Sequence, residues 1–205
     1  MEGLIILIIA LGLFVGIIVW AVKYSKKVNA RKGKLYGAFA EKHGLQHNSN
    51  KYMLNVLNTV EGTWKDYPFK VYEQIVGSGK NKTVMTYAVI GNLPFDYDFK
   101  IGKEHLFSKA GKALGLRDIE FGDAEFDKKF LIKAKDEEKF RAFFNYKLQD
   151  ELKQIKDDLR SSIRMNDGTL TYANYGPLAN EKAFTSFEKI VGFMFALVEE
   201  ADNRR

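Results

Sequence analysis

The stretch GLIILIIALGLFVGIIVWAV, from Gly3 to Val22, contains no charged residue, and the rest of the chain is organised around it. About 20 apolar residues in a helix, at a rise of about 1.5 Å each, span the roughly 30 Å of a hydrocarbon core. A helix satisfies its own backbone N–H and C=O groups, so such a segment is stable in lipid. The stretch therefore predicts a transmembrane anchor over residues 1–22.

Two other kinds of N-terminal segment fit this sequence less well. A cleaved secretory signal carries a basic region before a shorter apolar run, whereas the one charged residue before this run is Glu2. A lipoprotein anchor requires a cysteine, and the chain has none. We therefore expect the apolar segment to be retained.

The excess positive charge lies directly after the apolar stretch. The formal net charge is +6, and the basic juxtamembrane segment 23–34 contains no acidic residue, while basic and acidic side chains nearly balance in residues 35–205. Lysine and arginine beside a span favour the cytoplasmic side. This pattern predicts a single-pass protein of the cell inner (cytoplasmic) membrane with its domain in the cytoplasm. The residues expected to set this topology are Lys23, Lys26, Lys27, Arg31, Lys32 and Lys34.

A small-residue pair lies within the apolar stretch. Gly12 and Gly16 form a GxxxG pattern, which lets two helix backbones approach closely. Glycine is also common in transmembrane helices generally. The pattern therefore leaves three alternatives open for this face: a homodimer contact, contact with another protein, or lipid.

The first part of the domain combines one helix with β-structure. Helical spacing of apolar residues predicts a helix over 34–43 that ends at Gly44 and continues or restarts the anchor helix. Residues 51–59 are mixed in character and are expected to form a short helix or irregular structure. Aromatic and β-branched residues predict strands over 69–76 and 83–91, joined as a hairpin.

The second part alternates strands and amphipathic helices. Strands are expected over 96–103, 118–121 and 128–134. A hairpin is expected over 160–172, with its turn at Asn166-Asp167-Gly168. Helices are expected over 104–114, over 136–159 with a break near Asn145, and over 180–202. Asp136 is expected to cap the second of these helices. The sequence therefore predicts an α+β class: one domain, residues 35–205, with helices packed against a largely antiparallel sheet.

The chain lacks the usual patterns of phosphate and metal sites. Gly77-Ser78-Gly79-Lys80 contains a Gly-Lys pair, but a phosphate-binding loop needs an earlier glycine and a following Ser or Thr, where this chain has Gln74 and Asn81. A hairpin turn is the better interpretation. The spacing of His43, His47 and His105 matches no zinc pattern, so surface positions are expected. No catalytic, metal-ligating or cofactor-binding residue, and no cofactor, is assigned.

An acidic run is the strongest candidate for a ligand or interaction site. Neighbouring carboxylates can bind Ca²⁺ or raise one another's pKa, although this run lacks the spacing of a helix-loop-helix calcium site. Interleaved apolar residues favour a half-buried strand with a solvated acidic face. The residues concerned are Asp118, Glu120, Asp123, Glu125 and Asp127.

A nucleic-acid surface is disfavoured because the domain is nearly neutral. Trp64, Tyr67, Phe69 and Tyr72 are able to stack on bases, but aromatic residues in strands more often belong to the core. We therefore expect core positions for these four side chains.

Two stretches resemble a family of uncharacterised bacterial membrane-anchored proteins, a domain of unknown function. They are DFKIGKEHLFSKAGKALGLRDIEFGDAEFDKKFLIKAKDEEKFRAFF within residues 97–144, and MNDGTLTY, of which residues 167–172 carry the similarity. The pattern aromatic-Asp-Lys/Arg-x-Phe corresponds here to residues 126–130. The resemblance implies the fold and the membrane tether, and it assigns no catalytic residue.

These observations favour a membrane-tethered accessory or scaffold protein. Its expected partners are the lipid bilayer and another protein, or a second copy of the chain, and nucleic acid is not expected. The alternative is a membrane-tethered enzyme or small-ligand sensor with an acidic site near residues 118–127. An enzyme is the less favoured class because the sequence offers no recognisable catalytic constellation.

Overall fold

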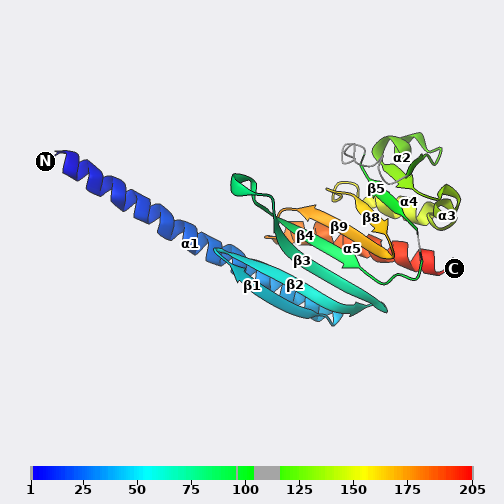
Figure 1. The fold of residues 1–205 in the computed structure, drawn as a ribbon, viewed down its shortest axis with the longest axis horizontal. Coiled ribbons are helices and arrows are strands. Elements are labelled where there is room, and N and C mark those ends of the chain that lie inside the picture. The colour runs from blue at the N-terminus through cyan, green and yellow to red at the C-terminus, as the bar shows by residue number, and fades with distance from the viewer. Residues whose placement is uncertain (1, 96, 104–115, 205) are drawn as a thin grey trace.

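The computed structural model describes residues 2–95, 97–103 and 116–204. Its first element is a single uninterrupted helix, α1 (Glu2–His43), as Figure 1 shows. The helix contains a segment of mean hydropathy 3.1 that is 0% buried, so it is long and apolar enough to cross a membrane and is not a core helix. Of the two alternatives for residues 34–43, the structure shows that they continue the apolar helix without a break.

Nine strands among the described residues form one antiparallel sheet, in the order β1-β2-β3-β4-β9-β8-β5-β7-β6. Hairpins join β1 to β2, β2 to β3, β3 to β4 and β8 to β9, and β6 also pairs with β7, so most neighbours in the sheet are also neighbours in sequence. The strands are β1 (Gln46–Tyr52), β2 (Asn55–Trp64), β3 (Tyr67–Val76), β4 (Thr83–Ile90), β5 (Phe99–Gly102), β6 (Arg117–Ile119), β7 (Leu131–Ala134), β8 (Ile163–Asn166) and β9 (Thr169–Tyr175).

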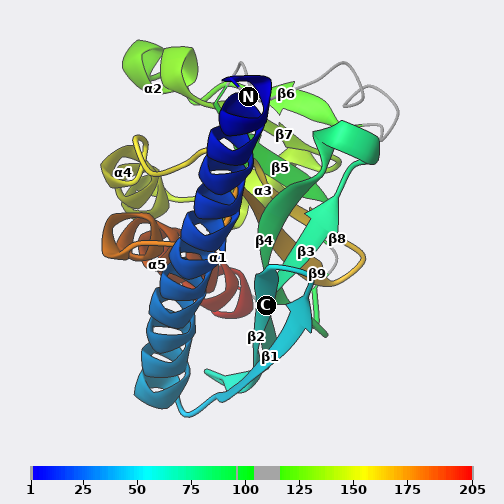
Figure 2. The ribbon, with the colours of Figure 1, turned by 90° about the vertical axis from the view of Figure 1, so that its left-hand side faces the viewer.

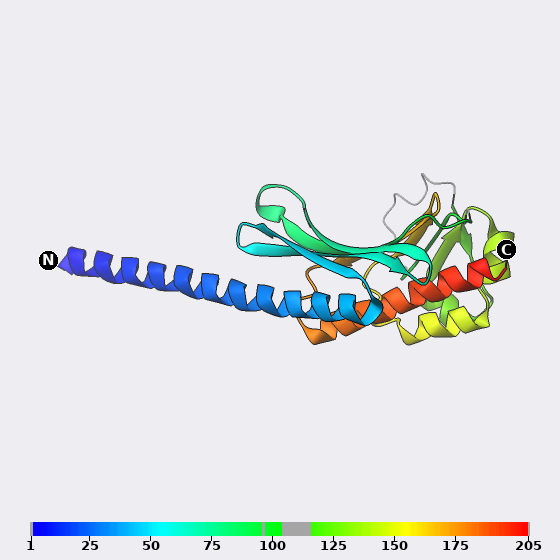
Figure 3. The same cartoon turned by 90° about the horizontal axis from the view of Figure 1, so that it is seen from below.

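The remaining helices are α2 (Ala124–Lys129), α3 (Glu137–Phe143), α4 (Tyr146–Gln154) and α5 (Glu181–Asp202). Figures 2 and 3 show α5 and the C-terminal half of α1 on the same side of the sheet. The predicted α+β class, with helices packed on a largely antiparallel sheet, is confirmed.

The core lies between α5 and the sheet. Phe187, Met194 and Leu197 of α5 are each no more than 1% exposed, and Phe69 and Ile90 of the sheet are no more than 2% exposed. Burying a side chain of this size stabilises the fold by roughly 1.5–3 kcal/mol before the entropy of ordering is subtracted. The apolar face of α5 therefore packs against the sheet and forms one core with it.

Capping residues set the helix boundaries as predicted. Asp136 accepts a hydrogen bond from the backbone N–H of Lys139 at the start of α3. Asn145 caps α4 and marks the predicted break, and Asn180 caps α5. The β8–β9 hairpin turns at the predicted residues, with Asp167 and Gly168 at positive φ.

Three expectations were wrong. Residues 51–59 form the end of β1, a tight turn and the start of β2, because seven register pairs hold β1 against β2. The acidic run is not one strand: only 117–119 is extended, and α2 follows. The strand expected over 128–134 begins at Leu131, because residues 128–129 end α2. The helix predicted over 104–114 lies outside the described residues.

Gly168 is required by both its backbone conformation and its surroundings. Its φ is +67°, and an added Cβ would lie 2.9 Å from the carbonyl oxygen of Leu93. Gly168→Ala should lower the free energy of unfolding by about 2 kcal/mol or more, because left-handed strain and a backbone clash add together. Urea denaturation of the full chain in detergent micelles measures this.

Gly176→Ala is the matched control. Gly176 has a φ of +89° with nothing within 4 Å of an added Cβ, so only strain of about 1 kcal/mol is expected. Equal losses in the two variants would contradict the role assigned to the contact with Leu93.

Candidate functional site

The acidic residues of the predicted site serve mainly as local structural groups. Asp123 caps α2, accepting hydrogen bonds from the N–H groups of Glu125 and Phe126, and pairs with Lys153 at 3.0 Å. The hydrogen bond from Lys153 lowers the pKa of Asp123, and the cap bonds act in the same direction. Asp127 accepts from two backbone N–H groups in the preceding turn, at 2.9 Å each.

The other members of the acidic run are similarly placed at the surface. Asp118 pairs with Lys133, and Glu125 pairs with Lys129 at 3.3 Å. Glu120 is exposed. Within the described part of the chain, no group of three or more His, Asp or Glu side chains is arranged to hold a metal ion. The structure therefore brings these carboxylates near α2 without making them converge.

His43 and His47 contact neighbouring side chains, and the glycine-rich loop connects two strands. The ring of His43 lies 3.9 Å from that of Trp64, and burial lowers the pKa of His43, with Lys42 acting in the same direction. His47 hydrogen-bonds Asn58. His105 lies outside the described residues. Residues 77–82 join β3 to β4, as expected of a hairpin loop.

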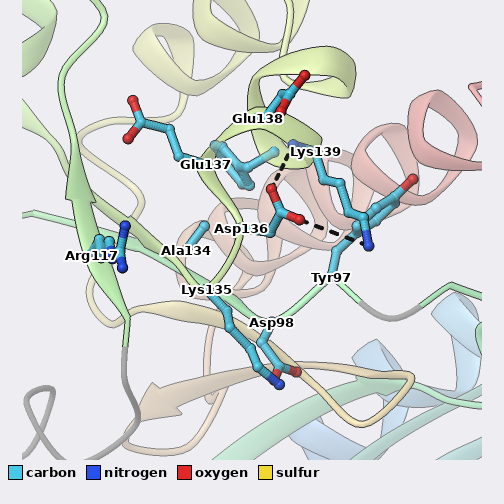
Figure 4. Close-up of a pocket in the computed structure, with 10 residues that line it drawn as sticks. Tyr97, Asp98, Arg117, Ala134, Lys135, Asp136, Glu137, Glu138 and Lys139 are labelled. Carbon is cyan, nitrogen blue, oxygen red and sulfur yellow. Dashed lines mark hydrogen bonds and ion pairs between the residues drawn. The ribbon is translucent and has the colours of Figure 1, made fainter.

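A cavity of 560 Å³ lies where the end of β7, the start of α3, Arg117 of β6 and residues 97–98 meet, and Figure 4 shows its charged lining. Lys135 pairs with Asp98 at 3.5 Å, and Asp136 is occupied as the cap of α3. Tyr97 stacks on Phe143. Lys139 lies 3.8 Å from Asp136, and Glu137 pairs with Arg141 outside the lining. Most of the charged groups shown are therefore paired or cap a helix, whereas Glu138 and Arg117 make no ion pair within the described residues.

The most unusual polar site lies between α1 and the sheet. Lys32 is 2% exposed, and its Nζ donates to Glu73 Oε1 at 3.0 Å, to Glu73 Oε2 at 2.9 Å and to the carbonyl oxygen of Val56 at 2.8 Å. Asn58 donates to Glu73 through both its backbone N–H and its side-chain amide, each at 2.9 Å. The ammonium group thus has one acceptor for each of its three N–H donors, so none of these donors is buried without a partner.

Two more side chains complete this buried polar cluster. Tyr36 is fully buried beside Glu73 and Thr86; burial raises its pKa well above the usual value, and the charge of Glu73 adds to the effect. The hydroxyl of Tyr36 makes no hydrogen bond of full geometry within the described residues. Thr86 is 0% exposed and donates to the carbonyl oxygen of Gly176. The cluster joins α1 to β2, β3 and β4.

The predicted topology residues therefore fall into two groups. Lys32 is buried and committed to Glu73 in the folded chain. The other five basic residues of the segment 23–34 are exposed and free to face a membrane surface. Gly12 and Gly16 have nothing within 4 Å of an added Cβ in the single chain, so the helix contact stays a prediction.

The sheet face turned away from α1 is a second candidate site, one for interaction. The strand register aligns four half-buried residues in one row across β2, β3, β4 and β9. They are Thr59, Tyr72, Tyr87 and Ala173. The rings of Tyr72 and Tyr87 stack at 5.1 Å. Tyr175, on the same face, is 63% exposed. We call these five residues the outer sheet face; within the described residues, the views in Figures 1 and 3 show no helix over it.

Of the four aromatic residues expected in the core, the structure confirms Phe69, which is 2% exposed, and packs Trp64 and Tyr67 at the core's edge. The prediction that Tyr72 belongs to the core was wrong. Side chains alternate along β3, so Tyr72 lies on the other face of the sheet from the buried Val71 and Glu73.

The ion pair of Lys32 with Glu73 gives a sharp test. Lys32→Met leaves the Glu73 carboxylate buried without its counter-charge, which should lower the free energy of unfolding by about 3–5 kcal/mol. In Lys32→Met/Glu73→Leu both charges are gone, and much of that loss should be recovered. Urea denaturation in detergent micelles measures both.

Lys34→Met is the matched control, since Lys34 is an exposed residue of the same segment. It should change the free energy of unfolding by no more than about 0.5 kcal/mol. If Lys32→Met were as mild as Lys34→Met, the pair would not be the buried contact described.

Sequence reasoning missed both the buried polar cluster and the outer sheet face. Lys32 has the same sequence surroundings as its basic neighbours, and Glu73 lies 41 residues further along the chain. One usable signal was Glu73 itself, because it alternates in β3 with the apolar residues Phe69, Val71 and Ile75 on one face of the strand. Comparisons with protein-family models, curated proteins and solved structures found no match for the chain.

Proposed function

We propose that this chain is a single-pass membrane protein whose domain binds another protein, acting as an accessory or scaffold subunit at the cytoplasmic face of a bacterial inner membrane. The observation that carries the proposal is the outer sheet face with its stacked pair Tyr72 and Tyr87. The anchor keeps this face close to the bilayer, where its partner would be another membrane-associated protein.

The anchor is supported by the exposure of the apolar half of α1. An 18-residue segment of high hydropathy is 0% buried, so no described residue of the domain covers it. The same helix runs on without interruption to His43, and its residues Tyr36 and Phe39 belong to the core. A cleaved signal sequence normally ends in a separate cleavage region, so this continuity favours a retained anchor. The exposed basic residues that follow favour a cytoplasmic domain.

The composition of the outer sheet face supports protein binding. Tyrosine is enriched at protein interfaces because its ring supplies apolar area and its hydroxyl remains able to hydrogen-bond. Beside polar residues such as Thr59, Lys70 and Gln74, which are usual on a solvated sheet face, this face carries Tyr72, Tyr87 and Tyr175. A pair of aromatic side chains already stacked loses little freedom on binding, which suits a binding hot spot.

The acidic alternative has weaker support. A small-ligand sensor or enzyme near residues 118–127 needs converging side chains, whereas Asp123 and Asp127 are used to hold the turn that starts α2. The outer sheet face therefore supports a binding function better than the acidic run supports chemistry.

Photo-crosslinking in native membranes tests the proposal. A p-benzoylphenylalanine at Gln74, an exposed position on the same side of β3 as Tyr72, should give one discrete adduct above the 23.5 kDa chain. Tyr72→Ser/Tyr87→Ser should reduce that adduct by about tenfold or more, because interface hot spots are aromatic and non-redundant. Immunoblotting and mass spectrometry identify the adduct.

Tyr146→Ser is the control, since Tyr146 is 84% exposed and belongs to α4. It should leave the adduct unchanged. No discrete adduct, an adduct containing only a second copy of the chain, or equal loss in both variants would contradict an accessory role through this face.

A further inference from the structure

The turn between β1 and β2 exposes apolar side chains at the end of the sheet nearer the apolar half of α1. Met53 is 77% exposed, Leu54 is 57% exposed and Tyr52 is 42% exposed. Figure 3 shows this hairpin reaching back along α1 toward the N-terminus. We call residues 52–54 the hairpin tip. Three consecutive exposed apolar side chains need a partner that is itself apolar.

The hairpin tip departs from the usual turn chemistry. Two-residue hairpin turns favour Asn, Asp and Gly, because these residues tolerate positive φ and remain hydrated. Here Met53 takes a φ of 53°, which is uncommon for a long unbranched side chain. The β2–β3 turn at the opposite end of the sheet uses Lys65 and Asp66, both also at positive φ. Only one of these two turns is apolar, and it is the one directed toward the anchor.

Hydrogen bonds fix the position of the hairpin tip along α1. The carbonyl oxygen of Leu54 accepts from Ser25 Oγ at 2.5 Å and from Asn29 Nδ2 at 2.8 Å, and Val56 N–H donates to Asn29 Oδ1 at 3.2 Å. Ser25 and Asn29 follow the last residue of the apolar stretch, Val22, by about 5 and 10 Å along the helix axis. The headgroup region extends about 5–7 Å beyond each side of the hydrocarbon core. Ser25 lies within this region and Asn29 just outside it, and Val22 lines the same cavity as Met53 and Leu54. The tip therefore lies at the depth of the headgroups when α1 spans the bilayer.

The surroundings of the hairpin tip match a membrane interface. Trp20 and Tyr24 stack at 5.5 Å and are both more than half exposed, as in the aromatic belts of membrane proteins. Lys26 and Lys51 line a cavity of 350 Å³ between the tip and α1. Lysine beside exposed apolar residues is the combination that binds anionic lipid surfaces.

We propose that the hairpin tip inserts into the boundary between headgroups and acyl chains, as a second membrane contact beside α1. This inference rests on the membrane anchor proposed above. The lipid bilayer is the occupant that the geometry favours, because α1 itself brings the tip to the membrane surface. A second copy of the chain or a protein partner would instead require a separate reason for an apolar tip at this depth.

Site-specific fluorescence tests the insertion. The chain has no cysteine, so single-cysteine variants label cleanly. Met53→Cys and Leu54→Cys are labelled with an environment-sensitive fluorophore, and the full-length chain is placed, one per disc, in nanodiscs of phosphatidylcholine and phosphatidylglycerol. Quenching by lipids with a nitroxide near the headgroup is compared with quenching by aqueous iodide. We expect the lipid quencher to remove at least half of the fluorescence at both positions, and iodide to have little effect.

Two further labels separate the possible outcomes. Asp66→Cys, at the polar turn, should respond to iodide and not to the lipid quencher. Phe14→Cys, within the apolar stretch, reports the anchor through a nitroxide placed deeper in the acyl chains. If Phe14→Cys is quenched but the tip labels respond to iodide, the tip is in water, and the inference fails while the anchor stands.

The remaining results are equally decisive. Tip labels shielded from both quenchers would mean that protein covers the tip, which also overturns insertion. An unquenched label at Phe14→Cys would overturn the anchor and the inference together. Strong lipid quenching at Met53→Cys and Leu54→Cys, with none at Asp66→Cys, establishes the second membrane contact.

Discussion

The buried ion pair between Lys32 and Glu73 is the contact on which the arrangement of helix and sheet depends. Apolar packing of Tyr36 and Phe39 would tolerate small shifts of α1, because hydrophobic contact has little directionality. A slip by one turn, about 5.4 Å, would separate the two charges and leave both buried without a partner. The pair therefore selects one register of α1 on the sheet, whatever its net contribution to the free energy of unfolding.

The sequence predicted those elements whose local pattern agrees with their tertiary role. In α5 the three-to-four spacing of large apolar residues coincides with the buried face, and Asn180 marks the start. The β8–β9 turn follows from Asn166-Asp167-Gly168 alone. The prediction failed at β1, whose sequence QHNSNKY has no apolar alternation. That strand is held by backbone hydrogen bonds to β2, and these bonds do not require any particular side-chain pattern.

The candidate sites were less predictable than the fold, because each is assembled from distant residues. Glu73 meets Lys32 only once β3 lies under α1, and Tyr72 meets Tyr87 only once β3 pairs with β4. The acidic run was visible in the sequence, yet its members cap α2 or pair with nearby lysines. Sequence clustering identified charge density correctly, but it could not separate groups that stabilise a turn from groups that bind a ligand.

The unbroken course of α1 from Glu2 to His43 has a mechanical consequence. With the anchor in a bilayer, the 21 residues after Val22 form a stiff lever about 30 Å long, to which the sheet is fixed. Transmembrane helices tilt by about 20° on average, and the tilt varies with bilayer thickness. Such a tilt would move the far end of the lever sideways by about 10 Å. The domain would then sweep across the membrane surface as the thickness of the lipid changes, without any hinge in the chain.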